Sequence, residues 1–199
     1  MTADGVTGGD ALDQVEQVDR VATPGAVDDA APAGSTAGRA RWGIFVAVAV
    51  AVIVVDQISK AWLVANVSAG QVVSVIGDLV RLVQSQNSGA LFGLFRDQAI
   101  LFALVSLGVI GLIVLYHARS VRSMYLSIAL GLLLGGAIGN LTDRLRLGYV
   151  VDWVDIGLGA IRWWTFNVAD AAISIAIVML VAMAIFPALA GSSRGEADA

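Results

Sequence analysis

The chain has 199 residues, of which 58% are apolar and 14% are charged, and its formal net charge at pH 7 is -4. Such a high apolar content is unusual for soluble domains and indicates an integral membrane protein. The sequence holds no cysteine and a single histidine, which excludes thiol catalysis and disulfides and leaves little room for a Cys/His metal site. No basic cluster indicates nucleic acid as a partner.

The N-terminal segment differs from the rest of the chain. Its first forty residues hold seven acidic residues, are rich in Gly, Ala, Ser and Thr, and show no sustained hydrophobic periodicity, which is typical of a disordered tail. No basic start is followed by a short apolar region, so we expect the first spanning helix to serve as its own insertion signal. We therefore predict an acidic tail over residues 1–41, a membrane domain over 42–190 and a short C-terminal tail over 191–199.

Four apolar stretches approach the roughly 20 residues that a membrane-spanning helix needs. They cover about residues 43–64, 99–117, 124–141 and 166–186. Arg39 and Arg41 precede the first stretch, and Arg119 and Arg122 lie between the second and third. Basic residues also occur on the opposite side, but the first helix usually dominates, so the positive-inside rule favours cytoplasmic termini.

One face of the membrane domain collects most of the unusual polar residues. The first and third spans end there, and the second and fourth begin there. These residues are Asp56, Lys60, Asn87, Gly89, Asn140, Asp143, Arg144, Asn167 and Asp170. We expect a functional site at this face, which is extracytoplasmic in the favoured orientation.

The two connections at this face have the pattern of short strands. Residues 71–86 are rich in β-branched residues and are interrupted by the turn dipeptide Gly77-Asp78, which predicts a β-hairpin. Residues 149–164 suggest one or two strands around Gly157 and Gly159, with three tryptophans available for the interfacial aromatic belt. We predict a small sheet on the outer membrane surface; plain amphipathic loops are the alternative.

Asp170 is the most conspicuous candidate for chemistry, because it lies about four residues, or about 6 Å, inside a membrane-length apolar run. A carboxylate in such a helix is costly and usually functional. The alternative is an acid placed at a helix start by the macrodipole, with Asn167 as the cap. Candidate partners on the same face are Asp56, Asp143, Asp152 and Asp155.

These four acids have different surroundings in the sequence. Asp56 is four residues before Lys60, the only lysine, so the two are expected to pair on one helix face. Asp143 belongs to the polar turn that runs from Asn140 to Arg144. Asp152 lies in the apolar segment GYVVDWVD, where desolvation is expected to raise its pKa.

Two carboxylates held together in a poorly solvated site share one proton. One can then take a proton from water while the other polarises a carbonyl or protonates the leaving group. This is the chemistry of an aspartic peptidase, and it needs neither metal nor cofactor. We predict Asp152 and Asp170 as this pair.

Four segments together resemble bacterial lipoprotein signal peptidase, also called signal peptidase II. They are DQISK (56–60), NSGALFG (87–93), GGAIGNLTDRLRLGYVVDWVD (135–155) and FNVADAAI (166–173). The resemblance extends over about residues 42–187. It implies an all-α membrane aspartic endopeptidase with four transmembrane helices, a small extracytoplasmic β-sheet over the site and cytoplasmic termini in the bacterial cytoplasmic membrane.

The resemblance also implies a substrate and roles for individual residues. Family members cut diacylglyceryl-modified prolipoproteins before the lipidated cysteine of the lipobox and are the target of globomycin. The catalytic pair would be Asp152 and Asp170. Since one chain holds a complete site, we expect a monomer to suffice, with membrane lipid as a further partner. Supporting or substrate-binding roles fall to Asp56, Lys60, Asn87, Gly89, Asn140, Asp143, Arg144 and Asn167. Leu91 and the long acidic tail depart from the family pattern.

Three other readings remain open at this stage. Ser59 precedes Lys60, as in a Ser-Lys peptidase, but adjacent helical residues point in directions about 100° apart. Acids and glycines in membrane helices also suit a transporter or proton pathway, although these acids cluster at one face. A scaffold protein without catalytic activity is the third reading.

Overall fold

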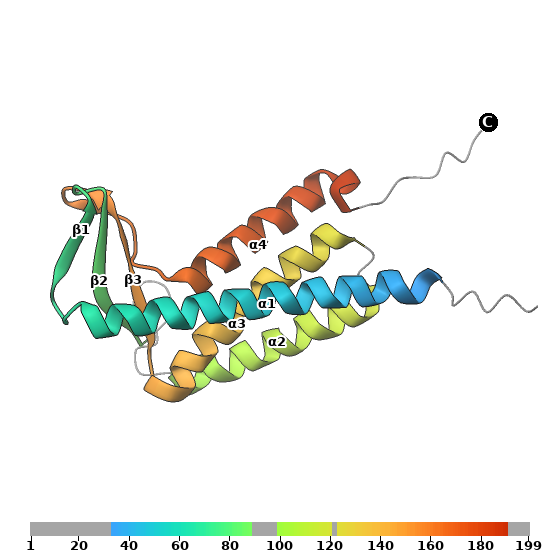
Figure 1. The fold of residues 1–199 in the computed structure, drawn as a ribbon, viewed down its shortest axis with the longest axis horizontal. Helices are drawn as coiled ribbons and strands as arrows, with labels where there is room; N and C mark the ends of the chain where they lie inside the picture. Colours follow the sequence, from blue (N-terminus) through green and yellow to red (C-terminus); the bar gives the residue numbers. More distant parts are fainter. Residues whose placement is uncertain (1–32, 89–98, 121–122, 191–199) are drawn as a thin grey trace, which may run out of the picture. The chain divides into compact units, whose positions relative to one another are not determined.

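The computed structural model describes residues 33–88, 99–120 and 123–190. Four long helices account for most of them (Figure 1): α1 (Ala33–Asn66), α2 (Ala99–Ser120), α3 (Met124–Leu147) and α4 (Val168–Ile185). A short 3-10 helix over Pro187–Ala190 follows α4. Each long helix is long and apolar enough to cross a membrane, which confirms the prediction of a multi-pass membrane protein.

Several predictions concern residues outside those described. These residues are 1–32 and 191–199 in the two tails, and Gly89 and Leu91 in the NSGALFG motif. The contacts divide the chain into residues 1–35 and 36–199, and the structural findings below concern the second unit.

Two helices extend beyond the expected limits. α1 begins at Ala33, about ten residues before the predicted span. α3 continues to Leu147 and is capped by Gly148, whose φ of 80° is in the left-handed region and whose N–H donates to the carbonyl of Arg144. The polar turn from Asn140 to Arg144 is therefore part of the helix.

Glycines on α3 allow α1 and α4 to approach it closely. A Cβ added at Gly135 would lie 2.7 Å from the carbonyl oxygen of Ala49 in α1, and one at Gly136 would strike the first turn of α4. A Cβ at Gly139 would lie 2.7 Å from Oδ2 of Asp56. Small residues serve such close packing in membrane helices, and here they bring the polar ends of three helices together.

The two connections form one antiparallel sheet in the order β1-β2-β3-β4. The strands are β1 (Val72–Ile76), β2 (Val80–Asn87), β3 (Val150–Leu158) and β4 (Ile161–Arg162). This confirms the expected hairpin and the strands around Gly157. β2 pairs with β3 so that Ser85 lies opposite Asp152 and Asn87 opposite Val150.

The sheet is attached to the end of α1 (Figure 1) through a small apolar cluster. Leu63 of α1 and Val151 of β3 are buried in this cluster, and Trp153 packs against them. Of the three tryptophans expected at the membrane interface, Trp153 is thus half-buried, whereas Trp163 and Trp164 are exposed. The contact positions β3, which carries Asp152, beside the helix ends.

Candidate active site

Asn167 connects the two predicted catalytic aspartates. Its side-chain Nδ2 donates to Oδ1 of Asp152 over 2.7 Å, and its Oδ1 accepts from the backbone N–H of Asp170 over 2.9 Å. Oδ2 of Asp170 in turn accepts from the backbone N–H of Asn167 over 3.3 Å. One buried amide group thus contacts both residues and brings β3 to the start of α4.

The reciprocal bonds between Asn167 and Asp170 form a capping box at the start of α4. The reading of Asp170 as a helix-start acid is therefore correct for its backbone contacts. The same residue also accepts a 2.8 Å hydrogen bond at Oδ1 from Nδ2 of Asn140 in α3. Asp170 is consequently held by donors from two helices.

Asp152 is 2% exposed and is also held by amides. Besides Asn167, Asn87 at the end of β2 donates from Nδ2 to Oδ2 of Asp152 over 3.0 Å. Burial, followed by the charge of Asp170, raises the pKa of Asp152 to about 7 in spite of the bonds from Asn87 and Asn167. The prediction of a raised pKa by desolvation is confirmed, and Asp152 can hold a proton near neutral pH.

A second polar cluster, centred on Lys60, lies directly beside this pair. The buried Lys60 ammonium is 2.8 Å from Oδ2 of Asp56 and 2.9 Å from Oδ2 of Asp143. Its Nζ also donates to Oδ1 of Asn140 over 3.3 Å. The expected pairing of Asp56 with Lys60 is confirmed, and Asn140 belongs to both clusters.

Several donors in this cluster were missed by the sequence analysis. Nε2 of Gln57 lies within hydrogen-bond distance of Oδ2 of Asp56, Oδ1 of Asp143 and the carbonyl of Gly139. The backbone N–H groups of Ala169 and Val151 donate to Asp56 and Asp143. The position of Gln57 next to Asp56 in an apolar helix was a signal for its role; the backbone donors have no signal in the sequence.

Arg144 lies at the border of the site. Its Nη1 donates to the carbonyl of Asn140 over 3.3 Å, and its guanidinium lies 5.6 Å from the centre of the Phe102 ring in α2. The group is close enough to Asp170 and Asp152 to interact with both electrostatically. It therefore adds positive charge beside the pair and is half-buried rather than enclosed.

Asp155 and Ser59 are directed to other partners. Asp155 accepts hydrogen bonds from Nε of Arg162 over 2.6 Å and from Nη2 of Arg81 over 2.8 Å, so it joins β2, β3 and β4. Oγ of Ser59 donates to the carbonyl of Asp56. Since the three acceptors around Lys60 use its three N–H groups, Lys60 is not arranged to activate Ser59.

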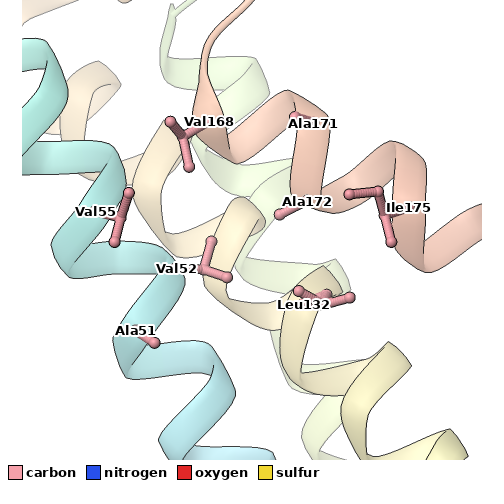
Figure 2. Close-up of a pocket in the computed structure, with 8 residues that line it drawn as sticks. All are labelled: Ala51, Val52, Val55, Leu132, Val168, Ala171, Ala172 and Ile175. Carbon is pink, nitrogen blue, oxygen red and sulfur yellow. The ribbon is translucent and has the colours of Figure 1, made fainter.

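An apolar groove of about 300 Å³ runs next to the first turn of α4. Figure 2 shows side chains of α1 and α4 on its two sides, with Leu132 of α3 between them. Val168 and Ala171, which line it, flank Asp170 closely in the sequence. The residues lining the groove are all aliphatic, so it offers an apolar surface between these helices.

No cluster of three His, Cys, Asp or Glu side chains suited to a metal ion occurs among residues 33–88, 99–120 and 123–190. The carboxylates are instead bound by amides, backbone N–H groups and the Lys60 ammonium.

Comparison with known proteins identifies the family of the chain. The model of a peptidase family described as signal peptidase (SPase) II matches residues 48–186. A lipoprotein signal peptidase of Leifsonia xyli is 40% identical over 151 residues, which cover 73% of this chain and 68% of that protein. The corresponding protein of Streptococcus agalactiae is 37% identical over 135 residues, covering 67% and 86%.

Solved structures extend the comparison to the fold. A bacterial membrane enzyme solved at 2.3 Å resolution aligns with a TM-score of 0.69 and 24% identity over 79% of this chain and 94% of its own. A second such structure, at 1.9 Å, has a TM-score of 0.66 and 25% identity over 72% and 93%. The four-helix fold with its small sheet is therefore shared with these enzymes.

Proposed function

The chain belongs to the signal peptidase II family, and on this premise we propose that it is an aspartic endopeptidase. Its substrates would be diacylglyceryl-modified prolipoproteins, cut before the lipidated cysteine of the lipobox. The observation that carries this proposal is the single Asn167 side chain that contacts both Asp152 and Asp170. We call these two aspartates the dyad.

The proposed reaction uses one proton shared by the dyad and one water molecule. The ionised carboxylate takes a proton from water as its oxygen attacks the scissile carbonyl, while the protonated carboxyl gives its proton to the carbonyl oxygen. A tetrahedral diol forms. When it collapses, the carbonyl is restored, the C–N bond breaks and a dyad proton passes to the leaving amine. A raised pKa of about 7 at Asp152 supports a dyad with one proton at neutral pH.

The surrounding residues would support this reaction in different ways. Asn140 and Asn167 orient the carboxylates through bonds of 2.8 and 2.7 Å without adding charge. Asp56, Lys60 and Asp143 hold α1, α3 and the start of β3 together behind them. Arg144 is available for the substrate backbone or for charge that develops on it. For Asn87, the bond to Asp152 supports a positioning role.

The apolar groove suits a substrate that arrives from the lipid. Its lining side chains come from α1, α3 and α4 and are all aliphatic, so an acyl chain or an apolar signal segment would lie against them favourably. We place the dyad at the extracytoplasmic face of the cytoplasmic membrane, with both termini in the cytoplasm. A monomer suffices for this function, because the residues of the proposed site come from one chain.

The direct test is cleavage of a purified diacylglyceryl-modified prolipoprotein in detergent, measured as a mass shift. We expect Asp152→Asn and Asp170→Asn each to reduce the rate at least about 10²-fold, the usual contribution of general acid-base catalysis, and globomycin to inhibit the wild type. Asp155→Asn is the matched control, because Asp155 is bound to Arg81 and Arg162 instead of the dyad. Full activity of Asp152→Asn together with inactivity of Asp143→Asn would assign the dyad to Asp143 and Asp170.

A further inference from the structure

The hydrogen bonds around Asn140 have a fixed direction. A lysine ammonium has three N–H donors and no acceptor. Nζ of Lys60 donates to Oδ2 of Asp56 and Oδ1 of Asn140, at 2.8 and 3.3 Å, and forms an ion pair with Oδ2 of Asp143 at 2.9 Å. The side-chain oxygen of Asn140 faces Lys60 and also accepts from Nδ2 of Asn167 over 3.1 Å, so its NH₂ group faces Asp170 at 2.8 Å.

This direction makes the surroundings of Asp170 suited to an anion. Its Oδ1 receives the Asn140 amide and its Oδ2 receives the backbone N–H of Asn167. Neither donor can reverse its role: the Asn140 amide is oriented by Lys60 and Asn167, and the other donor is a backbone N–H. Asp170 also lies in the first turn of α4, where the helix dipole favours negative charge.

The hydrogen-bond partners of Asp152 do not require it to be ionised. Its Oδ1 receives Nδ2 of Asn167, whose orientation is fixed because the other end of that amide accepts from Asp170 N–H. Its Oδ2 faces the side-chain amide of Asn87, a group with both a donor and an acceptor that can meet either protonation state. Asp152 is also nearly completely buried, which disfavours its charged form.

Arg144 does not determine which aspartate carries the proton. Its guanidinium interacts electrostatically with both Asp170 and Asp152, so it stabilises a negative charge on either. Asp56 and Asp143 are occupied by Lys60 and by backbone donors. The difference between the two dyad residues therefore rests on Asn140 and on the two donors that orient it, Lys60 and Asn167.

We infer that Asn140, oriented jointly by Lys60 and Asn167, is a positioning residue that keeps Asp170 ionised and so leaves the dyad proton on Asp152. Resting on the proposed peptidase function, this makes Asp170 the base that takes the proton from water and Asp152 the acid that protonates the carbonyl oxygen. Lys60 touches neither the substrate nor the water in this scheme.

The inference is tested by locating the proton directly. Infrared spectroscopy of the purified protein at pH 6 detects the carbonyl stretch of a protonated carboxyl group. We expect this band in the wild type, its loss in Asp152→Asn and its retention in Asp170→Asn. Loss of the band in Asp170→Asn with retention in Asp152→Asn would overturn the inference.

The role of Lys60 and Asn140 is tested by removing the hydrogen bonds that lead from Lys60 through Asn140 to Asp170, which we call the relay. In the double variant Asn140→Leu with Asp152→Asn, Asp170 lacks its side-chain donor, and we expect the band to return. Lys60→Met with Asp152→Asn removes only one of the two donors that orient Asn140, so we expect a weaker band there. Because Lys60→Met leaves Asp56 and Asp143 without their cation and can unfold the protein, Asn140→Leu is the variant that decides. No band in a folded Asn140→Leu double variant would refute the relay.

Gln57→Met is the matched control for this experiment. The Gln57 amide contacts Asp56 and Asp143, as Lys60 does, but its third contact is the carbonyl of Gly139 and not the side chain of Asn140. Combined with Asp152→Asn, this variant should show no band. A returning band would mean that any disturbance of the carboxylate cluster moves the proton, which contradicts a specific relay.

The readout separates this inference from the proposed function. The infrared band reports protonation without turnover, so it can assign the proton to Asp152 even if no prolipoprotein is cleaved. Conversely, cleavage with the proton on Asp170 would support the peptidase and refute the relay. In the cleavage assay, Asn140→Leu should lower kcat by about 10²-fold and alter the pH profile, whereas a structural role alone would leave the profile of the remaining activity unchanged.

Discussion

Replacing Asp152 by asparagine should stabilise the fold at alkaline pH, although it removes a proposed catalytic residue. The rise of its pKa from 3.8 to about 7 corresponds to about 4 kcal/mol of unfavourable interaction for the ionised form. Between about pH 4 and pH 7 the folded state binds a proton at Asp152 that the unfolded state has lost. The free energy of unfolding of the wild type therefore falls as the pH rises through this range.

Asparagine is neutral at every pH and avoids this cost. Its amide loses one of the two hydrogen bonds that Asp152 accepts from Asn87 and Asn167, a loss of about 1 kcal/mol. We expect Asp152→Asn to be more stable than the wild type by about 3 kcal/mol at pH 8 and less stable by about 1 kcal/mol near pH 4.

The measurement is denaturant unfolding in detergent micelles, followed by tryptophan fluorescence at several pH values from 4 to 8. Asp155→Asn serves as a control of opposite sign at pH 8, because its carboxylate is paired with Arg81 and Arg162. A stability difference between wild type and Asp152→Asn that stays constant over this range would refute the assignment of the raised pKa. So would a variant that is less stable at pH 8.

Three further predictions follow from the same contacts. Cleavage of a lipidated precursor should decline as the pH rises above about 7, because the dyad then lacks its proton; a rate still rising at pH 9 would contradict this. Gly139→Ala should reduce both activity and stability, since its Cβ would lie 2.7 Å from Asp56, whereas Gly111→Ala, with nothing within 4 Å, should be neutral or stabilising by up to about 1 kcal/mol in thermal unfolding. Asp155→Asn should increase hydrogen exchange of β4, because it removes the ion pair with Arg162; unchanged exchange would show that the pair does not hold the strand.

Hydropathy and turn chemistry predict most of the fold. The four spans follow from their length and apolar content, and the Gly77-Asp78 turn predicts the hairpin of β1 and β2. The pairing of β2 with β3 was not predicted, because residues about 65 to 75 positions apart leave no local pattern that specifies their register. That pairing brings Asn87 to Asp152.

The candidate site was only partly predictable from the residues themselves. The free-energy cost of a carboxylate in a membrane helix identifies Asp170, and the apolar sequence around Asp152 identifies Asp152. Hydrophobic periodicity alone does not exclude Asp143 and Asp155 as partners of Asp170. The contacts separate them: Asp155 binds two arginines of the sheet, and Asp143 binds Lys60 and a backbone N–H. Such partners come from segments remote in sequence or from the backbone, where side-chain identity carries no signal.

The composition of the site explains why one of its acids should stay neutral. Asp56 and Asp143 share the single positive charge of Lys60, so these three buried residues together carry an excess negative charge before the dyad is counted. One further carboxylate is balanced by Arg144 and by the start of α4. A second would add an uncompensated charge where water is largely excluded, which is costly. Protonation of Asp152 removes that charge, so the arrangement that stabilises the helix ends also supplies the proton that the proposed reaction needs.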